Sequence, residues 1–212
     1  MPVDAGVSKD GVVFQREQYA KGGIGRKYWD YRDNNIMDAV AGSFRPDSRI
    51  VDVGCGEGIL LEKLVKRYPG ADLEGLDLDP LNIAICAEHG LRVREGGAYV
   101  LPYETASLDL CLFIEVIEHL EKPEKAIAEL YRVLKPGGRL AVLFPNDATF
   151  KLARLATGMV KEAYYDTGHL RQWTPRALGR TLNSAGFRVL LDKSLPVPFF
   201  PMALHHLTVA GK

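Results

Sequence analysis

Apolar residues along this chain follow two alternating patterns. Short runs rich in Val, Ile and Leu stand between longer segments in which apolar residues recur every three or four positions. The first pattern predicts buried strands and the second predicts helices with one apolar face. The predicted strands span residues 49–53, 72–77, 91–95, 108–114 and 139–144. The predicted helices lie near residues 60–68, 80–88 and 127–134. This order predicts βαβ units that build a parallel sheet with right-handed crossovers.

The last third of the chain is expected to close the sheet with a further helix and two strands. Thr174 is placed to cap that helix, Pro175 suits its first position, and Gly186 ends it. The closing strands are predicted near residues 187–191 and 206–210, which brings the sheet to seven strands.

The domain organisation follows from these elements. We expect residues 1–45 to form an N-terminal helical arm, with one helix around residues 28–40, and residues 46–212 to form the domain proper. Residues 145–173 show a less regular pattern. The predicted fold class is α/β: a single globular domain with a doubly wound, mostly parallel, seven-stranded sheet.

Composition sets the class of protein without naming its chemistry. The 212 residues are 47% hydrophobic and 25% charged, as in an ordinary globular domain. A formal net charge of zero gives the molecule no electrostatic reason to bind nucleic acid or an anionic membrane. The three cysteines lack metal-type spacing and predict reduced thiols. Without a signal-peptide pattern or an apolar run long enough to span a bilayer, the expected location is the cytoplasm.

The segment V-D-V-G-C-G-E-G joins a buried strand to a helix and carries the strongest functional signal. Its glycines allow a sharp bend and close approach to a ligand. Their spacing departs from the G-x-G-x-x-G of dinucleotide sites, and Asp52 would repel a pyrophosphate but can reach an ammonium group. Asp77, at the end of the next strand, is placed to accept hydrogen bonds from ribose hydroxyls. These features favour S-adenosylmethionine (SAM) over NAD.

Several motifs together resemble the class I SAM-dependent methyltransferases, above all the small family that includes the ubiquinone-pathway O-methyltransferases. They are V-D-V-G-C-G-E-G, Asp77, the Leu-Pro-Tyr before L-D-L-C-L-F-I-E-V-I-E-H-L, and L-Y-R-V-L-K-P-G-G-R-L, within about residues 49–190. The resemblance implies a seven-stranded SAM-binding fold in which Asp77 holds the ribose. The other residues that it places beside the cofactor are Gly54, Gly56, Gly58, Ile114 and Glu115.

One position departs from that family. Members often carry an Asp that reads the adenine amino group, whereas this chain has Gly97 there. Backbone groups and apolar contacts from Leu78 and Ala98 are then expected to hold the adenine.

The N-terminal arm is rich in aromatic residues between Tyr19 and Arg32. In relatives such an arm closes over SAM, and Arg32 is suited to pair with the carboxylate of the cofactor. The alternative is that the aromatic side chains only pack the arm onto the sheet.

Two histidines are candidates for a general base. His119 follows the fourth strand, and His169 precedes the helix that begins at Pro175. Either imidazole can take a proton from an acceptor hydroxyl. The alternative is that each histidine only stabilises its loop.

A divalent cation such as Mg²⁺ is a further candidate cofactor. The E-x-x-E-H arrangement resembles the metal site of plant small-RNA terminal 2′-O-methyltransferases. Its candidate ligands are Glu115, Glu118, His119 and His169. Mixed Glu and His ligands are not the oxygen set that Mg²⁺ prefers. The other interpretation is that Glu118 and His119 simply begin a helix.

The sequence therefore predicts a SAM-dependent methyltransferase whose acceptor is a small molecule, with an oxygen as the methylated atom. The proline-rich loop at residues 195–202 either covers a sheet edge or lines an acceptor pocket. Two other functions stay open. RNA ribose 2′-O-methylation draws on the eight basic against three acidic residues in 151–193, although no RNA-binding module is evident. A non-catalytic SAM-binding protein would fit the missing adenine carboxylate.

Overall fold

The sheet at the centre of the molecule confirms the predicted fold class. The computed structural model describes residues 15–156 and 168–212. Within them the strand order is β3-β2-β1-β4-β5-β7-β6. The strands are β1 (Arg49–Val53), β2 (Asp72–Asp77), β3 (Val93–Glu95), β4 (Leu108–Ile114), β5 (Leu134–Pro145), β6 (Arg188–Leu195) and β7 (His205–Gly211). Strands β1 to β5 pair in parallel, whereas β7 runs antiparallel to both β5 and β6.

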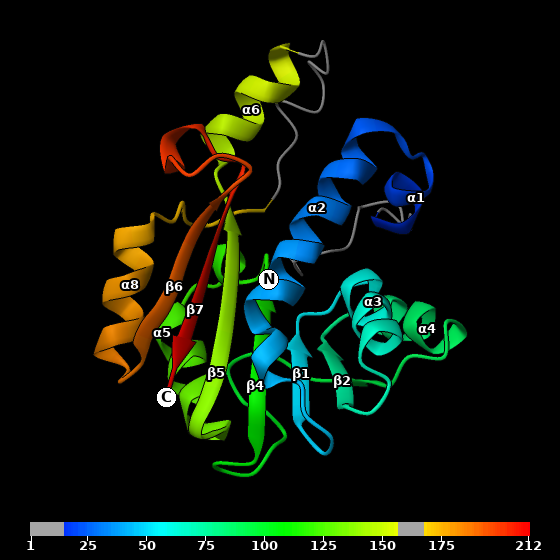
Figure 1. Ribbon diagram of the computed structural model, residues 1–212, viewed down its shortest axis with the longest axis vertical. Coiled ribbons are helices and arrows are strands. Elements are labelled where there is room, and N and C mark those ends of the chain that lie inside the picture. The colour runs from blue at the N-terminus through cyan, green and yellow to red at the C-terminus, as the bar shows by residue number, and fades with distance from the viewer. Residues whose placement is uncertain (1–14, 157–167) are drawn as a thin grey trace.

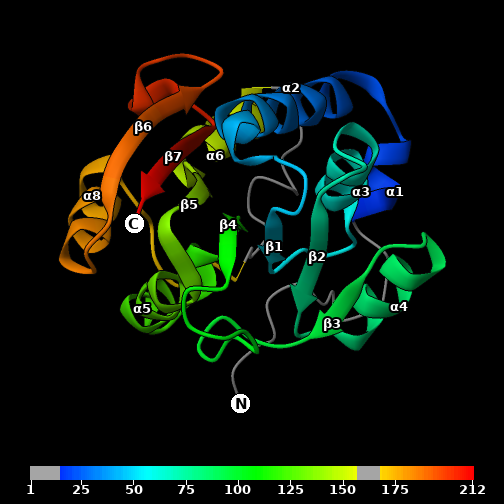
Figure 2. The same cartoon turned by 60° about the horizontal axis from the view of Figure 1, so that its bottom comes forward.

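Helices cover both faces of this sheet. The helices of the described residues are α1 (Gln15–Ala20), α2 (Gly23–Val40), α3 (Ile59–Arg67), α4 (Pro80–Glu88), α5 (Pro123–Val133), α6 (Asp147–Ala156) and α8 (Pro175–Ser184), with short 3₁₀ turns η1 (Ala41–Ser43), η2 (Ile117–His119) and η3 (Phe200–Met202). Helices α2 and α3 lie on one side of the sheet and α5 and α8 on the other (Figure 2). In the described part of the chain, no helix is long and apolar enough to cross a membrane.

Alternating burial along the central strands explains the two layers of helices. Leu110 and Leu112 of β4 contribute to the core beneath α2 and α3, whereas Cys111 and Phe113 contribute to the core beneath α5 and α8. Successive strand residues point to opposite faces, so a strand buried on both faces is continuously apolar. That continuity made the central strands predictable from their sequence.

Several elements differ from the prediction. The arm was expected to hold one helix, but it also contains α1, and α5 begins at Pro123 rather than near residue 127. Strand β6 continues to Leu195 rather than ending near residue 191. Helix α2 begins at Gly23, well before residue 28, and its first turns carry mostly polar and exposed residues. Strand β5 begins at Leu134 rather than 139, directly after α5. Helix α6 occupies part of the segment predicted as irregular, and it stands beyond the carboxyl ends of β4 and β5 (Figure 1). The rest of that segment, residues 157–167, lies outside the described residues.

Candidate active site

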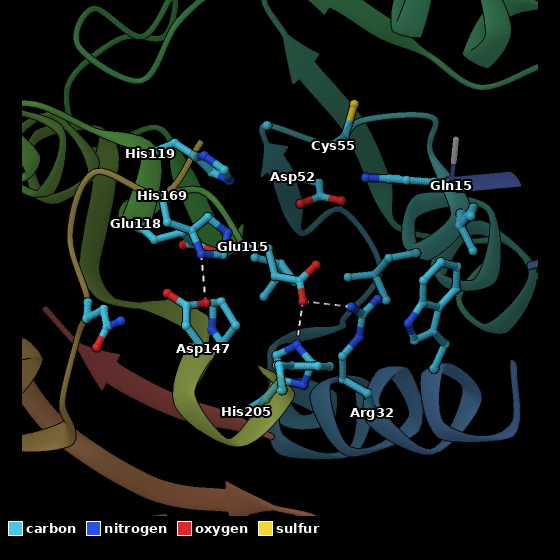
Figure 3. A pocket seen from close by; sticks show the side chains of 18 of the residues that line it. Gln15, Arg32, Asp52, Cys55, Glu115, Glu118, His119, Asp147, His169 and His205 are labelled. Atoms are coloured by element: carbon cyan, nitrogen blue, oxygen red, sulfur yellow. Dashed lines mark hydrogen bonds and ion pairs between the residues drawn. The ribbon is translucent and has the colours of Figure 1, made fainter. Parts of the chain in front are cut away.

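A cavity of about 460 Å³ lies at the carboxyl ends of β1, β4 and β5 (Figure 3). This is the edge where doubly wound sheets bind their ligands. Residues of α1, α2, α3, α6 and η2, the first residue of β7 and the segment before α8 add to its wall. Among the predicted site residues, the wall contains Arg32, Asp52, Gly54, Ile114, Glu115, Glu118, His119 and His169. The predicted contacts Gly56, Gly58, Asp77, Leu78 and Ala98 are not among the described residues of the wall.

The backbone geometry of the turn after β1 requires glycine. Gly54, Gly56 and Gly58 have φ angles of 76°, 55° and 75°. A Cβ on Gly54 would lie 2.5 Å from Cγ2 of Val116, and one on Gly58 would lie 2.6 Å from a methyl carbon of Leu91. Residues other than glycine rarely adopt this conformation, and none fits these contacts without displacing a neighbour.

Asp77 is bound to the same turn. Its Oδ2 accepts a hydrogen bond from the N–H of Gly56 at 2.7 Å, and its Oδ1 accepts from Asp79 N and Asn82 Nδ2 at 2.9 and 3.1 Å. The residue is only 7% exposed. The carboxylate that the sequence predicts for ribose binding therefore lies at the glycine turn and now bonds to protein donors.

Asp52 is the buried acid at the end of β1. Burial, followed by the negative charges of Asp77 and Asp33, raises the pKa of Asp52 to about 7, although Arg32 opposes the rise. A nearby cation would lower that pKa again. The position thus suits a positively charged ligand group, as its place before the first glycine predicts.

Glu115 occupies the middle of the cavity, where Figure 3 shows it between His205 and Arg32. Its Oε1 lies 3.1 Å from Arg32 Nη1 and 2.5 Å from His205 Nε2. Burial alone would raise the pKa of Glu115, but the charge of Arg32 and the hydrogen bond with His205 outweigh it and hold that pKa far below its usual range. Glu115 is therefore an anion at neutral pH.

This ion pair extends into a chain of polar contacts on both sides. Nδ1 of His205 lies 2.7 Å from the hydroxyl of Tyr28. On the other side, Nε of Arg32 donates to Asp33, and Asp33 in turn accepts from Lys63 on α3 at 2.7 Å. Helix α2 is thereby tied to β4, β7 and α3 around the cavity.

A second cluster comprises Glu118, His119 and His169. One candidate ligand atom from each of the three lies within 4.8 Å of the others. The backbone oxygen of Glu118 accepts hydrogen bonds from Leu170 and Arg171 at 2.9 and 3.2 Å, which brings the His169 segment beside η2. The predicted ligand Glu115 does not belong to this group of three, because its carboxylate pairs with Arg32 and His205.

The carboxyl group of Glu118 is unusual for a buried acid. Both oxygens are inaccessible to solvent and have no hydrogen-bond partner among the described residues. Burial, followed by the charge of Glu115, raises the pKa of Glu118 well above its usual value. An unpaired buried carboxyl group is costly, so its conformation calls for a partner that the described residues do not supply.

Both imidazoles of the cluster use the same ring nitrogen for support. His119 Nδ1 lies 3.2 Å from the carbonyl oxygen of Gly168, and His169 Nδ1 lies 2.8 Å from Oδ1 of Asp147. Because these oxygens accept, Nδ1 carries the proton in each ring and Nε2 keeps a lone pair. Burial, followed by the neighbouring His169, lowers the pKa of His119. Each histidine is thus suited to accept a proton or a cation.

Sequence reasoning did not identify Asp147 or His205 as site residues. Asp147 begins α6, which was not predicted. His205 pairs with Pro145 in the antiparallel β5–β7 ladder, so the first residue of β7 lies at the carboxyl end of β5. His205 could have been identified from the two adjacent histidines at the start of the last strand. Antiparallel pairing of that strand with β5 places its first residue at the carboxyl end of β5.

Comparisons with known proteins agree on one domain type. Residues 51–142 match the model of a methyltransferase domain family. The chain is 41% identical over 124 residues to a demethylmenaquinone methyltransferase of Thermus thermophilus, covering 55% of this chain and 54% of the relative. It is 34% identical over 102 residues to a ubiquinone biosynthesis O-methyltransferase of Hahella chejuensis, covering 45% of this chain and 42% of that protein. The chain thus matches about half the length of these curated relatives.

A solved structure extends the likeness over nearly the whole chain. A SAM-dependent methyltransferase from Archaeoglobus fulgidus superposes with a TM-score of 0.67 at 19% identity, covering 94% of this chain and 99% of that one. At this identity the superposition shows a shared fold.

Proposed function

We propose that this chain, whose residues 51–142 match a methyltransferase domain family, transfers a methyl group from SAM to a small acceptor with an ionisable hydroxyl, such as a phenol or hydroquinone. The observation that carries the proposal is the cavity itself. It combines a wall of ionisable side chains, Arg32, Asp52 and Glu115, with two imidazoles whose Nε2 atoms have no hydrogen-bond partner among the described residues. The names of the two quinone-pathway relatives support the acceptor class.

The residues present fit the cofactor. Arg32, Asp52, Gly54 and Glu115 would hold its methionine part, because a zwitterion needs both a cation and an anion opposite it. Asp77 would bind the ribose after giving up its hydrogen bond to the glycine turn. Leu78, Ala98 and neighbouring backbone groups would contact the adenine. Gly56 and Gly58, in the turn after β1, would lie beside the cofactor. When bound, SAM supplies a methyl group on a sulfonium, a good leaving group for in-line displacement.

His169 is the proposed general base. Asp147 fixes its orientation and tautomer through Nδ1, which leaves Nε2 to take the acceptor proton. A deprotonated phenol is nucleophilic at oxygen and at ring carbons, and we propose oxygen as the methylated atom. His119, with its ring 4.8 Å from that of His169, is the second candidate for this role.

A divalent cation held by Glu118, His119 and His169 is the competing proposal for acceptor activation. The buried carboxyl group of Glu118, without a partner among the described residues, favours it. Two imidazoles and one carboxylate suit Zn²⁺ or Mn²⁺ better than Mg²⁺, which prefers oxygen ligands. Such a cation would bind the acceptor hydroxyl and lower its pKa.

Metal analysis of the purified protein, EDTA treatment and Glu118→Gln distinguish the two roles. If a cation activates the acceptor, metal copurifies, and both EDTA and Glu118→Gln abolish turnover. If His169 acts alone, no metal is found and turnover survives both treatments. Glu121→Gln, at an exposed residue three positions along the chain, is the matched control.

The experiment that tests the function as a whole is calorimetric titration with S-adenosylhomocysteine, using NAD as the control. Micromolar binding of S-adenosylhomocysteine alone is the expected result and would justify a screen of phenols and hydroquinones with SAM. Absence of binding would contradict the proposal and leave the non-catalytic alternative without its ligand as well.

The acceptor class, the cellular compartment and the division of the chain are also proposals. The relatives lend no support to RNA ribose methylation, so a small molecule is the proposed partner. A reducing compartment, with the cytoplasm as our choice, is consistent with the unpaired thiols of Cys55, Cys86 and Cys111. The division into an arm of residues 1–45 and a domain of residues 46–212 also stays a proposal.

A further inference from the structure

His205 is a fully buried imidazole beside the cavity whose two nitrogens are both engaged. It is 1% exposed, with Nε2 at 2.5 Å from Glu115 and Nδ1 at 2.7 Å from the hydroxyl of Tyr28. An ionised carboxylate only accepts hydrogen bonds, so Nε2 carries the proton and Nδ1 accepts from the tyrosine. The contacts therefore specify one neutral tautomer of His205 in one orientation. The hydrogen bonds run from Tyr28 through His205 to Glu115.

Aromatic packing holds the imidazole in that orientation. The ring of Tyr28 stacks on it at 5.6 Å between centroids with an interplanar angle of 16°, and the ring of Phe150 meets it edge-on at 4.9 Å. A ring enclosed on two sides cannot turn without displacing α2 or α6. His205 is thus a rigid donor pointed at Glu115.

Glu115 depends on such support because its own backbone is in a rare conformation. Its φ is 56°, in the left-handed region, and its side chain is about one-third exposed to the cavity. One carboxylate oxygen, Oε1, receives both Arg32 and His205. Figure 3 shows the other oxygen directed away from both, toward the side of the cavity that holds Asp52. Strained residues of this kind cluster at ligand-binding sites.

We propose that His205 and Tyr28 are positioning residues for the amino-acid end of SAM: they hold Glu115 beside Arg32, so that a carboxylate and a guanidinium face the ammonium and carboxylate of the cofactor. The inference rests on the proposed function. Without His205, Glu115 is free to close onto Arg32 in a bidentate pair, which would withdraw both charges from the ligand.

The charge change during methyl transfer explains why this pair belongs to the amino-acid end. The sulfonium loses its positive charge in the reaction, so a carboxylate fixed against it would stabilise the ground state more than the transition state. The ammonium keeps its charge throughout, and its binding is uniform along the reaction. Loss of His205 should accordingly raise KM for SAM while kcat changes little.

The test compares two ligands that differ only in the amino-acid part. S-adenosylhomocysteine carries the zwitterion, whereas 5′-methylthioadenosine has the same nucleoside and thioether without it. Calorimetric titration should show that His205→Phe weakens S-adenosylhomocysteine binding about tenfold or more and leaves 5′-methylthioadenosine binding unchanged. Tyr28→Phe should give a smaller loss of about threefold on the first ligand alone. Tyr31→Phe, on the same helix and without a side-chain hydrogen bond in the described residues, is the matched control.

Each outcome bears on the proposal. An equal loss for both ligands means that His205 only stabilises the fold, and it overturns the inference, as does unchanged binding of both. If His205→Phe does not fold, Tyr28→Phe decides, because it removes one hydroxyl and keeps the ring. An unmodified chain that binds neither ligand overturns the proposed function and this inference with it. An unmodified chain that binds both ligands confines any failure to His205 and Tyr28.

Discussion

Two carboxylate–imidazole pairs face one cavity, and their surroundings give them different chemistry. His205 is enclosed and bonded at both nitrogens, so it can orient Glu115 but cannot exchange a proton with a ligand. His169 is bonded at Nδ1 to Asp147 and lines the cavity. An imidazole that lines the cavity and has no partner for Nε2 among the described residues, as His169 and His119 do, is suited to proton transfer.

His169→Gln is expected to lower kcat about 100-fold or more, with little change in KM for SAM, because a general base contributes about 10² to 10⁴ in rate. Asp147→Asn should cost less, about tenfold, since the base remains but its orientation is less well fixed. Steady-state kinetics on an accepted phenol measures both. His89→Gln, on the exposed end of α4, is the control and should leave kcat unchanged. A normal kcat for His169→Gln would remove the residue from the mechanism.

The raised pKa of Asp52 predicts how the stability of the folded chain changes with pH. Its pKa is about 7 in the folded chain, whereas an unfolded carboxyl group titrates near 4. Between these values the folded state holds a proton that the unfolded state has lost, so the contribution of this group to stability is present at low pH and is lost as pH rises through that window. Relative to the unmodified chain, Asp52→Asn should therefore gain stability from pH 4 to 7, by about 4 kcal/mol at most, and no more above pH 7.

Urea unfolding of both proteins at several pH values measures this difference. The subtraction cancels the titration of all other groups to first order. Parallel stability curves across pH 4 to 8 would show that Asp52 is ionised in the folded chain, contrary to the electrostatic environment described for it.

The sequence specified some site residues and not others for a physical reason. Asp52 lies near the end of a predicted strand, and Gly54 and Glu115 follow predicted strands directly, so their place at the sheet edge comes from local pattern alone. His205 reaches the same edge through antiparallel pairing with a strand sixty residues earlier in the chain. Asp147 acts through a helix that the hydrophobic pattern did not reveal. Contacts set by tertiary pairing leave no trace in a short window of sequence.

At the scale of elements, alanine substitution of two glycines should change stability in opposite directions. One glycine lies in the turn between β1 and α3, and the other lies inside α8. Gly54→Ala puts a side chain at φ 76° and only 2.5 Å from Val116, so it should destabilise the chain by about 1–3 kcal/mol and weaken S-adenosylhomocysteine binding. Gly179→Ala lies inside α8 with open space around its Cβ, so it should stabilise by about 0.5–1 kcal/mol and leave binding unchanged. Chemical denaturation and calorimetry measure the two effects. Equal effects at the two positions would contradict the argument from backbone conformation.

Element prediction succeeded where burial is complete on one or both faces. Strands β1 and β4 were located because most of their residues are apolar and buried, and α8 because Thr174 caps it, accepting a hydrogen bond from Ala177 N at 3.2 Å. The start of α2 was missed because its first turns are polar and exposed, and the helix gains its stability further along, where Ile36 and Val40 pack on the sheet. A helix end without an apolar face or a side-chain cap gives the sequence pattern nothing to detect.

The charge balance of the whole molecule bears on the RNA alternative. The chain has 27 basic and 27 acidic residues, and several basic side chains around the sheet are paired with acids, as in the Lys135–Asp109 and Arg94–Glu74 bridges. Binding to a polyanion depends on cations that release counterions, and paired cations release few. From this charge balance we expect RNA to bind weakly, and the basic residues in 151–193 make that expectation worth testing.

We expect a short single-stranded RNA to bind with millimolar to high-micromolar affinity at physiological salt and with a shallow salt dependence. Each phosphate neutralised contributes a slope of about −0.7 to a plot of log affinity against log salt, so a slope shallower than about −2 means fewer than three such contacts. Fluorescence anisotropy between 50 and 200 mM salt measures it, with S-adenosylhomocysteine present so that the cavity is filled. Because a ribose methyltransferase must hold several phosphates to present one hydroxyl, a slope of −4 or steeper would restore RNA as an acceptor and displace the phenol and hydroquinone class.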